Sequence, residues 1–334
     1  MNWFERLAGI EERNPEYVRG QLDLKGETLI SRVNGQRWQA GRLETPSLGE
    51  LRERVGQLDL PTGRLQIREV VADARELHAD PENANALFQV ASQFNLLEMV
   101  APDRTPEHGI GIYEHDRTQG PVCAISAGAG TICRNYLVPV NGRTGQSAEN
   151  QIDCLVDLGE ALGNQDQRLW TMRNGYALAT ESGLADIAKQ LARASESKRD
   201  ELRARLRIGL HWNTQVTVSG CEHTVSQAYC SALPVAYSRL PKNQWEPFAR
   251  LVLEASYEAT ILAGLLNHQA TGDPRVYLTL IGGGAFGNDD DWIVESIQRT
   301  VEMWINAPLD LNVVSYGRSQ PLIQTMIDRM GQVA

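Results

Sequence analysis

Three adjacent aspartates follow a glycine-rich stretch late in the chain. The apolar segment 276–281 runs into the sequence GGGAFGN at residues 282–288 and then into Asp289–Asp291, and a helix is expected from about Trp292. Glycines let a backbone approach a ligand closely and point N–H groups at phosphate, and a helix N-terminus adds partial positive charge. The Gly-Lys-Ser/Thr of a P-loop is absent. The pattern therefore predicts either a ligand loop with neighbouring carboxylates or a turn in which the aspartates cap the helix.

A second polar segment spans residues 91–137. A predicted strand ends at Gln93-Phe94-Asn95, a long polar loop follows, and a small-residue helix begins near Pro121, which suits a first helical turn. Polar side chains beyond the carboxyl end of a strand either bind a ligand or satisfy the loop backbone. The candidate ligand-binding residues of this segment are Gln93, Asn95, Glu98 and Gln119, and its candidate catalytic residue is Asp116.

The arrangement strand–GGGAFGN–helix resembles the second ligand loop of macrodomains and poly(ADP-ribose) glycohydrolases. That resemblance implies that the loop wraps the pyrophosphate and distal ribose of ADP-ribose. The residues implied as the cradle are Gly282, Gly283, Gly284, Ala285, Phe286 and Gly287, with Asn288 near the distal ribose. The segment 91–137 is similar to the first half of a macrodomain site. Asn95 matches a strand-end asparagine, while Asp116 and Gln119 loosely resemble the glycohydrolase loop acid and glutamine. The Gln-Glu-Glu of the glycohydrolases is absent.

The resemblance implies an enzyme that removes ADP-ribose from an ADP-ribosylated protein. Cleavage of an ADP-ribosyl bond passes through an oxocarbenium-like centre, and a carboxylate stabilises that charge or activates water. Clustered carboxylates also bind a cationic guanidinium bidentately, which favours an arginine linkage. We expect catalysis at Asp290 and Asp291 ahead of Asp289, with Asp116 as a further candidate. No cofactor is expected, with ADP-ribose as ligand and product.

Three other interpretations remain open at this point. The same fold could bind ADP-ribose or another nucleotide without turnover. The oxygen-rich run at residues 288–291 could instead hold a divalent cation for a nucleotide hydrolase. Finally, Cys123 near the start of a predicted helix, with His211 or His223 as partner, loosely resembles the nucleophile of papain-like cysteine proteases.

The surrounding elements alternate in a way that is typical of an α/β protein. From about residue 85, apolar runs of strand length alternate with amphipathic helical segments, which predicts a three-layer α/β/α macrodomain-like sandwich with a mixed sheet. Residues 1–75 instead contain alternating apolar and polar residues and an Asn34-Gly35 hairpin signal. Ser47 with Glu50 predicts a capped helix. We therefore expect an N-terminal β-rich extension at 1–75 and a catalytic domain at 76–334.

Composition limits the classes of partner. Of 334 residues, 42% are hydrophobic and 22% are charged, and the net charge is −10, which disfavours nucleic-acid binding. No apolar run approaches membrane-span length, and the acidic N-terminus does not resemble an export signal, so no membrane partner is expected. The five cysteines are scattered without a CxxC pair, which is typical of free thiols and predicts a cytoplasmic location.

Overall fold

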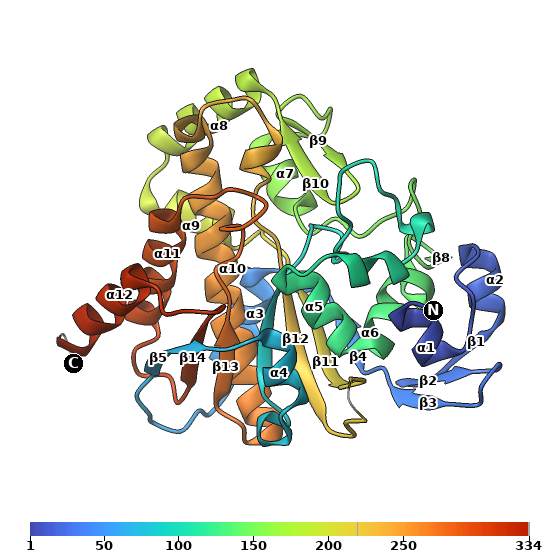
Figure 1. Cartoon of the computed structure of the whole chain (residues 1–334). Coiled ribbons are helices and arrows are strands. Elements are labelled where there is room, and N and C mark those ends of the chain that lie inside the picture. The colour runs from blue at the N-terminus through green and yellow to red at the C-terminus, as the bar shows by residue number, and fades with distance from the viewer. Residues whose placement is uncertain (219, 333–334) are drawn as a thin grey trace.

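A seven-stranded mixed sheet forms the centre of the computed structural model, which describes residues 1–218 and 220–332 (Figure 1). All strands run parallel except β11, which pairs antiparallel with both of its neighbours. From one edge to the other the strands are β4 (Arg42–Glu44), β11 (Gly209–Gln215), β12 (Thr224–Cys230), β6 (Leu87–Ala91), β13 (Arg275–Leu278), β14 (Asp310–Ser315) and β5 (Gln66–Val71). The carboxyl ends of β12, β6 and β13 therefore lie side by side at one edge of the sheet.

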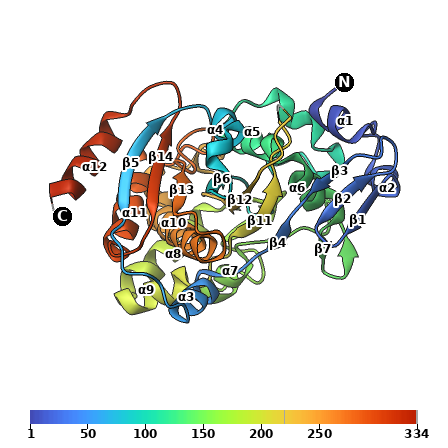
Figure 2. The ribbon, with the colours of Figure 1, turned by 90° about the horizontal axis from the view of Figure 1, so that it is seen from below.

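Helices cover both faces of the sheet, as the view from below shows (Figure 2). On one face α10 (Lys242–Thr271) packs on β6, β12 and β13 and is itself flanked by four other helices. These are α3 (Leu48–Gly56), α8 (Glu181–Arg193), α9 (Glu196–Arg203) and α11 (Asp290–Met303). On the other face lie α4 (Ala74–Ala79), α5 (Gln119–Ser126) and α6 (Gly128–Ile132). The predicted α/β/α sandwich with a mixed sheet is confirmed.

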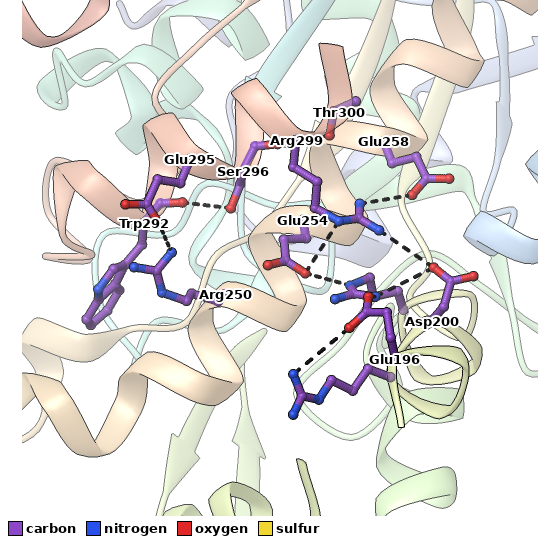
Figure 3. Close-up of polar contacts among 12 residues, drawn as sticks. Glu196, Asp200, Arg250, Glu254, Glu258, Trp292, Glu295, Ser296, Arg299 and Thr300 are labelled. Atoms are coloured by element: carbon purple, nitrogen blue, oxygen red, sulfur yellow. Dashed lines mark hydrogen bonds and ion pairs between the residues drawn. The ribbon is translucent and has the colours of Figure 1, made fainter. Parts of the chain in front are cut away.

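A network of ion pairs joins the helices on the α10 face (Figure 3). Arg299 of α11 reaches Glu254 and Glu258 of α10, and Arg52 of α3 reaches the same Glu258 with an Nε–Oε1 distance of 2.6 Å. Asp200 of α9 accepts from Arg52 as well. Glu258 is buried, so the surrounding guanidinium groups supply the compensating charge that a buried carboxylate requires. This network lies on the helical layer, away from the strand ends.

The N-terminal segment forms a small unit beside the main sheet. It contains α1 (Trp3–Ala8), α2 (Pro15–Gly20) and the antiparallel strands β1 (Leu22–Lys25), β2 (Thr28–Ser31) and β3 (Arg37–Gln39). Its buried side chains share one hydrophobic cluster with Ile110, Tyr113 and Tyr136 of the main unit. Strands β4 and β5, which also lie before residue 75, belong to the central sheet. The predicted boundary at residue 75 therefore does not coincide with an edge of that sheet.

Several local predictions agree with the structure. Ser47 and Glu50 form a reciprocal capping box at the start of α3, and Asn34-Gly35 lies in the turn between β2 and β3. The charged segment at 181–203 forms two helices, α8 and α9, which divide at Ala194 because Ser195 caps the second one. No helix among the described residues is long and apolar enough to span a membrane.

Shorter elements complete the chain. The hairpins are β7 (Pro139–Val140) with β8 (Arg143–Thr144) and β9 (Trp170–Arg173) with β10 (Tyr176–Ala179). The remaining α-helices are α7 (Val156–Leu162) and α12 (Pro321–Gln332). Single 3-10 turns occur at Pro81–Asn83, Pro106–His108, Gly111–His115 and Val235–Tyr237, and a π-helical turn occurs at Cys133–Leu137.

Candidate functional site

A cleft of about 740 Å³, including its open mouth, lies at the carboxyl ends of β12, β6 and β13. Ligands of open α/β sheets bind at this edge. The lining comes from residues 91–93 and 98–100 after β6, residues 116 and 118–121 at the start of α5, residues 279–286 without 281 and 283 after β13, and Tyr176, Cys230, Ala232 and Tyr237. The two segments singled out in the sequence therefore meet across one cleft.

The loop after β6 is held in shape by its own amide side chains. The Oε1 atom of Gln93 accepts from the N–H of Met99 at 2.9 Å, and Oδ1 of Asn95 accepts from the N–H of Leu97 at 3.1 Å. These bonds hold a sharp turn in which Leu96 has a φ of 63°. Gln93 lines the cleft, whereas the fully buried Asn95 is not among the described lining residues. The structure thus gives Asn95 a role in shaping the loop.

Helix α5 begins at the wall of the cleft with its N-terminus facing inward. The Gln119 side chain accepts from the N–H of Ala91 and donates to the carbonyl of Gln89, both at 2.9 Å, and so fixes the helix to β6. Gly120 permits this close approach, because a Cβ there would lie 2.0 Å from the Ala91 carbonyl oxygen. Thr118 makes no side-chain capping bond. The N–H groups of Gln119 and Gly120 have no acceptor among the described residues and are left for a ligand.

The glycine-rich loop after β13 forms the opposite wall. Gly282 and Gly287 have φ values of 78° and 69°, and a Cβ at Gly282 would lie 2.4 Å from the Ala232 Cβ, so glycine is required there. The N–H groups of Gly284, Ala285 and Phe286 have no acceptor among the described residues. Successive free N–H groups of this kind form an anion-binding concavity. Gly283 and Gly287, two of the six predicted cradle residues, do not line the cleft.

Asn288 and the three aspartates lie beyond the cleft. Asn288 is buried and donates to the carbonyls of Leu233 and Gly282, so it fastens the base of the loop. The Asp289 carboxylate accepts from the N–H of Asp291 at 3.2 Å and caps α11. Asp290 and Asp291 are exposed in the first turn, and none of the three aspartates is among the described lining residues. Their position is that of helix-capping acids, which the dipole of α11 favours.

Asp116 is the predicted catalytic residue that does lie at the cleft. Its Oδ1 atom accepts from the N–H of Thr118 at 2.8 Å, which shapes the turn into α5. The second carboxylate oxygen makes no hydrogen bond with the described residues. Asp116 thus presents one free acceptor at the start of α5.

Glu98 stands at the floor of the cleft with only 2% of its surface exposed. Neither carboxyl oxygen has a hydrogen-bond partner among the described residues. The nearest cation is the fully buried Arg134, whose Nη2 atom is 3.6 Å from Oε1 of Glu98. Burial raises the pKa of Glu98 to about 8, and this outweighs the lowering by Arg134 and by Tyr113. The group is therefore largely protonated at neutral pH.

An aromatic cluster closes one side of the cleft. Tyr176, Tyr237 and Phe286 lie with ring centroids 5.1 to 5.6 Å apart. Such a cluster offers flat apolar surface for a base or a sugar. Phe286 was predicted as a cradle residue, whereas Tyr176 and Tyr237 were not among the predicted site residues, because no sequence signal indicated that they meet Phe286.

The structure disfavours the thiol alternative. Cys123 is fully buried and is not among the described residues of the cleft, and burial raises the pKa of its thiol well above the usual value. A nucleophilic cysteine needs the opposite shift. His211 is also fully buried, and the Nε2 atom of His223 donates to the His78 carbonyl at 2.9 Å.

The divalent-cation interpretation requires several ligand side chains close together. Within residues 1–218 and 220–332, no group of three or more His, Cys, Asp or Glu side chains is arranged to hold a metal ion. The run at residues 288–291 instead makes the capping and loop contacts described above.

Comparison with known proteins gives only distant likenesses. No model of a known protein family matches the chain, and no curated protein matches it. Among solved structures, poly(ADP-ribose) glycohydrolase from Deinococcus radiodurans in complex with ADP-ribose shares 14% identity over 87% of this chain and 94% of that chain, with a TM-score of 0.46. The same enzyme from Thermomonospora curvata shares 12% identity over 98% of both chains, with a TM-score of 0.45. At this distance the likeness does not assign an activity to the chain.

Proposed function

We propose that this protein binds ADP-ribose in the cleft and hydrolyses an ADP-ribosyl linkage to protein. The observation that carries the proposal is the pair of facing N–H donor groups, one in the loop at Gly284–Phe286 and one at the start of α5. Together they suit a diphosphate, which carries negative charge at two adjacent groups. The aromatic cluster supplies a surface for the adenine or a ribose.

A second part of the proposal concerns the amino acid to which the ADP-ribose is attached. An arginine linkage was expected from carboxylates at residues 289–291, and these lie outside the cleft. Asp116 is the predicted catalytic carboxyl group that lines the cleft, where its free oxygen can accept a hydrogen bond from a guanidinium. An arginine linkage is therefore supported by Asp116, and arginine-linked substrates are to be tested together with other linkages.

A binding module without turnover is the second candidate. The position of the three aspartates favours it, because clustered carboxylates beside the ligand were the feature that argued for an enzyme. The two candidates share the same ligand and differ only in whether a bond is broken. A binding experiment therefore tests what they have in common.

Calorimetric titration with ADP-ribose tests the ligand. Gly284 has open space around its Cβ position and no positive φ, so Gly284→Val leaves the fold intact while filling the phosphate wall. We expect micromolar binding by the wild type and at least about a tenfold loss in Gly284→Val. Gly20, at the end of α2, has equally open space, and Gly20→Val is the matched control that keeps full affinity. Absence of binding by the wild type would remove the proposal.

A further inference from the structure

One ionisable group in the cleft is left without the contacts that buried polar groups normally have. Within the described part of the chain, both carboxyl oxygens of Glu98 lack a hydrogen-bond partner, although the residue is almost wholly buried. Its backbone is fixed, because its N–H donates to the Tyr113 hydroxyl at 3.0 Å. Buried polar atoms are nearly always paired, and an unpaired one at a functional site requires an explanation. A carboxyl group without such partners, on a residue that lines the cleft, points to a bound ligand as the missing partner.

Arg134 does not satisfy this carboxyl group. Its guanidinium donates from Nε to the Leu96 carbonyl at 3.0 Å and from Nη2 to the Thr131 hydroxyl at 3.1 Å. It also lies 3.7 Å from the centre of the Tyr229 ring. The 3.6 Å separation from Glu98 is too long for a direct hydrogen bond. Arg134 is thus held by other partners, near enough to stabilise a carboxylate once one forms.

Gly120 leaves the space that Glu98 occupies. A Cβ at Gly120 would lie 3.2 Å from the Glu98 Cγ atom, so the start of α5 and the side chain of Glu98 are in contact. The side chain of Glu98 therefore lies beside the first turn of α5, where the diphosphate end of the ligand is proposed to bind. Asp116 and Gln119 line the same wall. An acid at this place is close to the ribose that follows the diphosphate.

We propose that Glu98 is the general acid of the reaction, which rests on the proposed function. Its proton passes to the leaving atom as the bond between that atom and the anomeric carbon of the distal ribose breaks, and the bonding electrons leave with that atom. Water adds to the anomeric carbon, and its proton returns to the Glu98 carboxylate, which Arg134 stabilises in the interval. Atoms and charge balance without a metal or a second reactant. General acid catalysis of this kind contributes about 10²- to 10⁴-fold in rate.

The test compares two substrates with Glu98→Gln, which keeps the shape of the protonated acid. One substrate is an ADP-ribosylated protein that the wild type hydrolyses, and the other is 4-nitrophenyl ADP-ribose, whose phenolate leaves without a proton. We expect the hydrolysis rate of Glu98→Gln to fall by about 10²-fold or more on the protein substrate and by less than about tenfold on 4-nitrophenyl ADP-ribose. The wild-type rate on the protein substrate falls above about pH 8, and the variant lacks this limb. Unchanged ADP-ribose affinity in calorimetry shows that the variant is folded.

The controls separate this inference from the proposed function. Glu149→Gln changes an exposed glutamate outside the cleft and keeps wild-type rates on both substrates. Equal rates in the wild type and Glu98→Gln, or equal losses on both substrates, would overturn the role of Glu98 and leave the proposed function standing. A wild type that binds ADP-ribose but hydrolyses neither substrate would overturn both the role of Glu98 and the enzymatic proposal. Glu98→Asp keeps a carboxyl group and is expected to restore part of the lost rate.

Discussion

The ionisation of Glu98 should make the stability of this protein depend on pH, and Glu98→Gln should remove that dependence. The ordinary pKa of a glutamate is 4.5, and burial raises that of Glu98 to about 8 in the folded protein. Between these values the folded state holds a proton that the unfolded state has released, so stability falls as pH rises. At about 1.4 kcal/mol per pKa unit, the loss reaches at most about 5 kcal/mol by pH 8.

Urea denaturation of the wild type and Glu98→Gln, at intervals from about pH 5 to about pH 9, measures this loss. The free energy of unfolding of the variant should increase relative to that of the wild type as pH rises, because glutamine cannot ionise. The gain should level off above the folded pKa. Glu149→Gln removes an exposed carboxylate and should show no such trend. A constant difference between wild type and Glu98→Gln across the range would refute the raised pKa and, with it, the supply of a protonated acid at neutral pH.

Three further changes test local contacts at the cleft, at the N-terminal unit and at the edge strand β5. Gly120→Ala places a Cβ 2.0 Å from the Ala91 carbonyl oxygen, so α5 must move; we expect a loss of about 1–3 kcal/mol in urea denaturation and of ADP-ribose binding in calorimetry. Glu12→Ala leaves the N–H groups of Ile110 and Gly111 without their acceptor, and should cost about 1–3 kcal/mol and speed hydrogen exchange in residues 106–115. Partial burial raises the pKa of Glu69, but hydrogen bonds from Ser315, Ser319, Gln324 and the Gln320 N–H lower it to about 2, so its contribution is present above about pH 4.5 and is lost as pH falls toward 2. Glu69→Gln should therefore speed hydrogen exchange in α12 at neutral pH and have a smaller effect at pH 3; equal effects at both would contradict the assignment.

The layers of this fold could be predicted because local signals agreed with the tertiary arrangement. The apolar runs that became β6, β12, β13 and β14 are buried between two helical layers, and each lies in the expected order along the chain. The capping box of Ser47 and the turn at Asn34-Gly35 follow from residues a few positions apart. The glycine-rich loop could also be placed at the cleft from its position after a strand.

The aspartates at residues 289–291 show that one sequence pattern can fit two different roles. An aspartate at the start of a helix suits both a cap and a catalytic site, and the side chain of Asp289 turns back to the N–H of Asp291 instead of toward the cleft. Both roles are compatible with these residues, and the packing of α11 on α10, which no local pattern contains, places the aspartates outside the cleft.

Glu98 was predicted as a ligand-binding residue, but its burial could not have been foreseen. Arg134 lies 36 positions away in sequence and is fully buried beside it. The N-terminal unit packs its core against Tyr113, whose hydroxyl holds the backbone of Glu98. Contacts between segments this distant in sequence create the low-dielectric surroundings that shift the pKa. Nothing in the sequence of this polar loop indicates that the Glu98 carboxyl group will be buried and its pKa raised.

Release of ADP-ribose from proteins modified through defined linkages tests the central claim most directly. Purified protein is incubated with arginine-, serine- and glutamate-linked substrates and with ADP-ribose polymer, and the product is measured by mass spectrometry. The account predicts that the wild type releases ADP-ribose from at least one linkage and that Gly284→Val does not. Binding of ADP-ribose without release from any of them would show a binding module, and neither binding nor release would contradict the account.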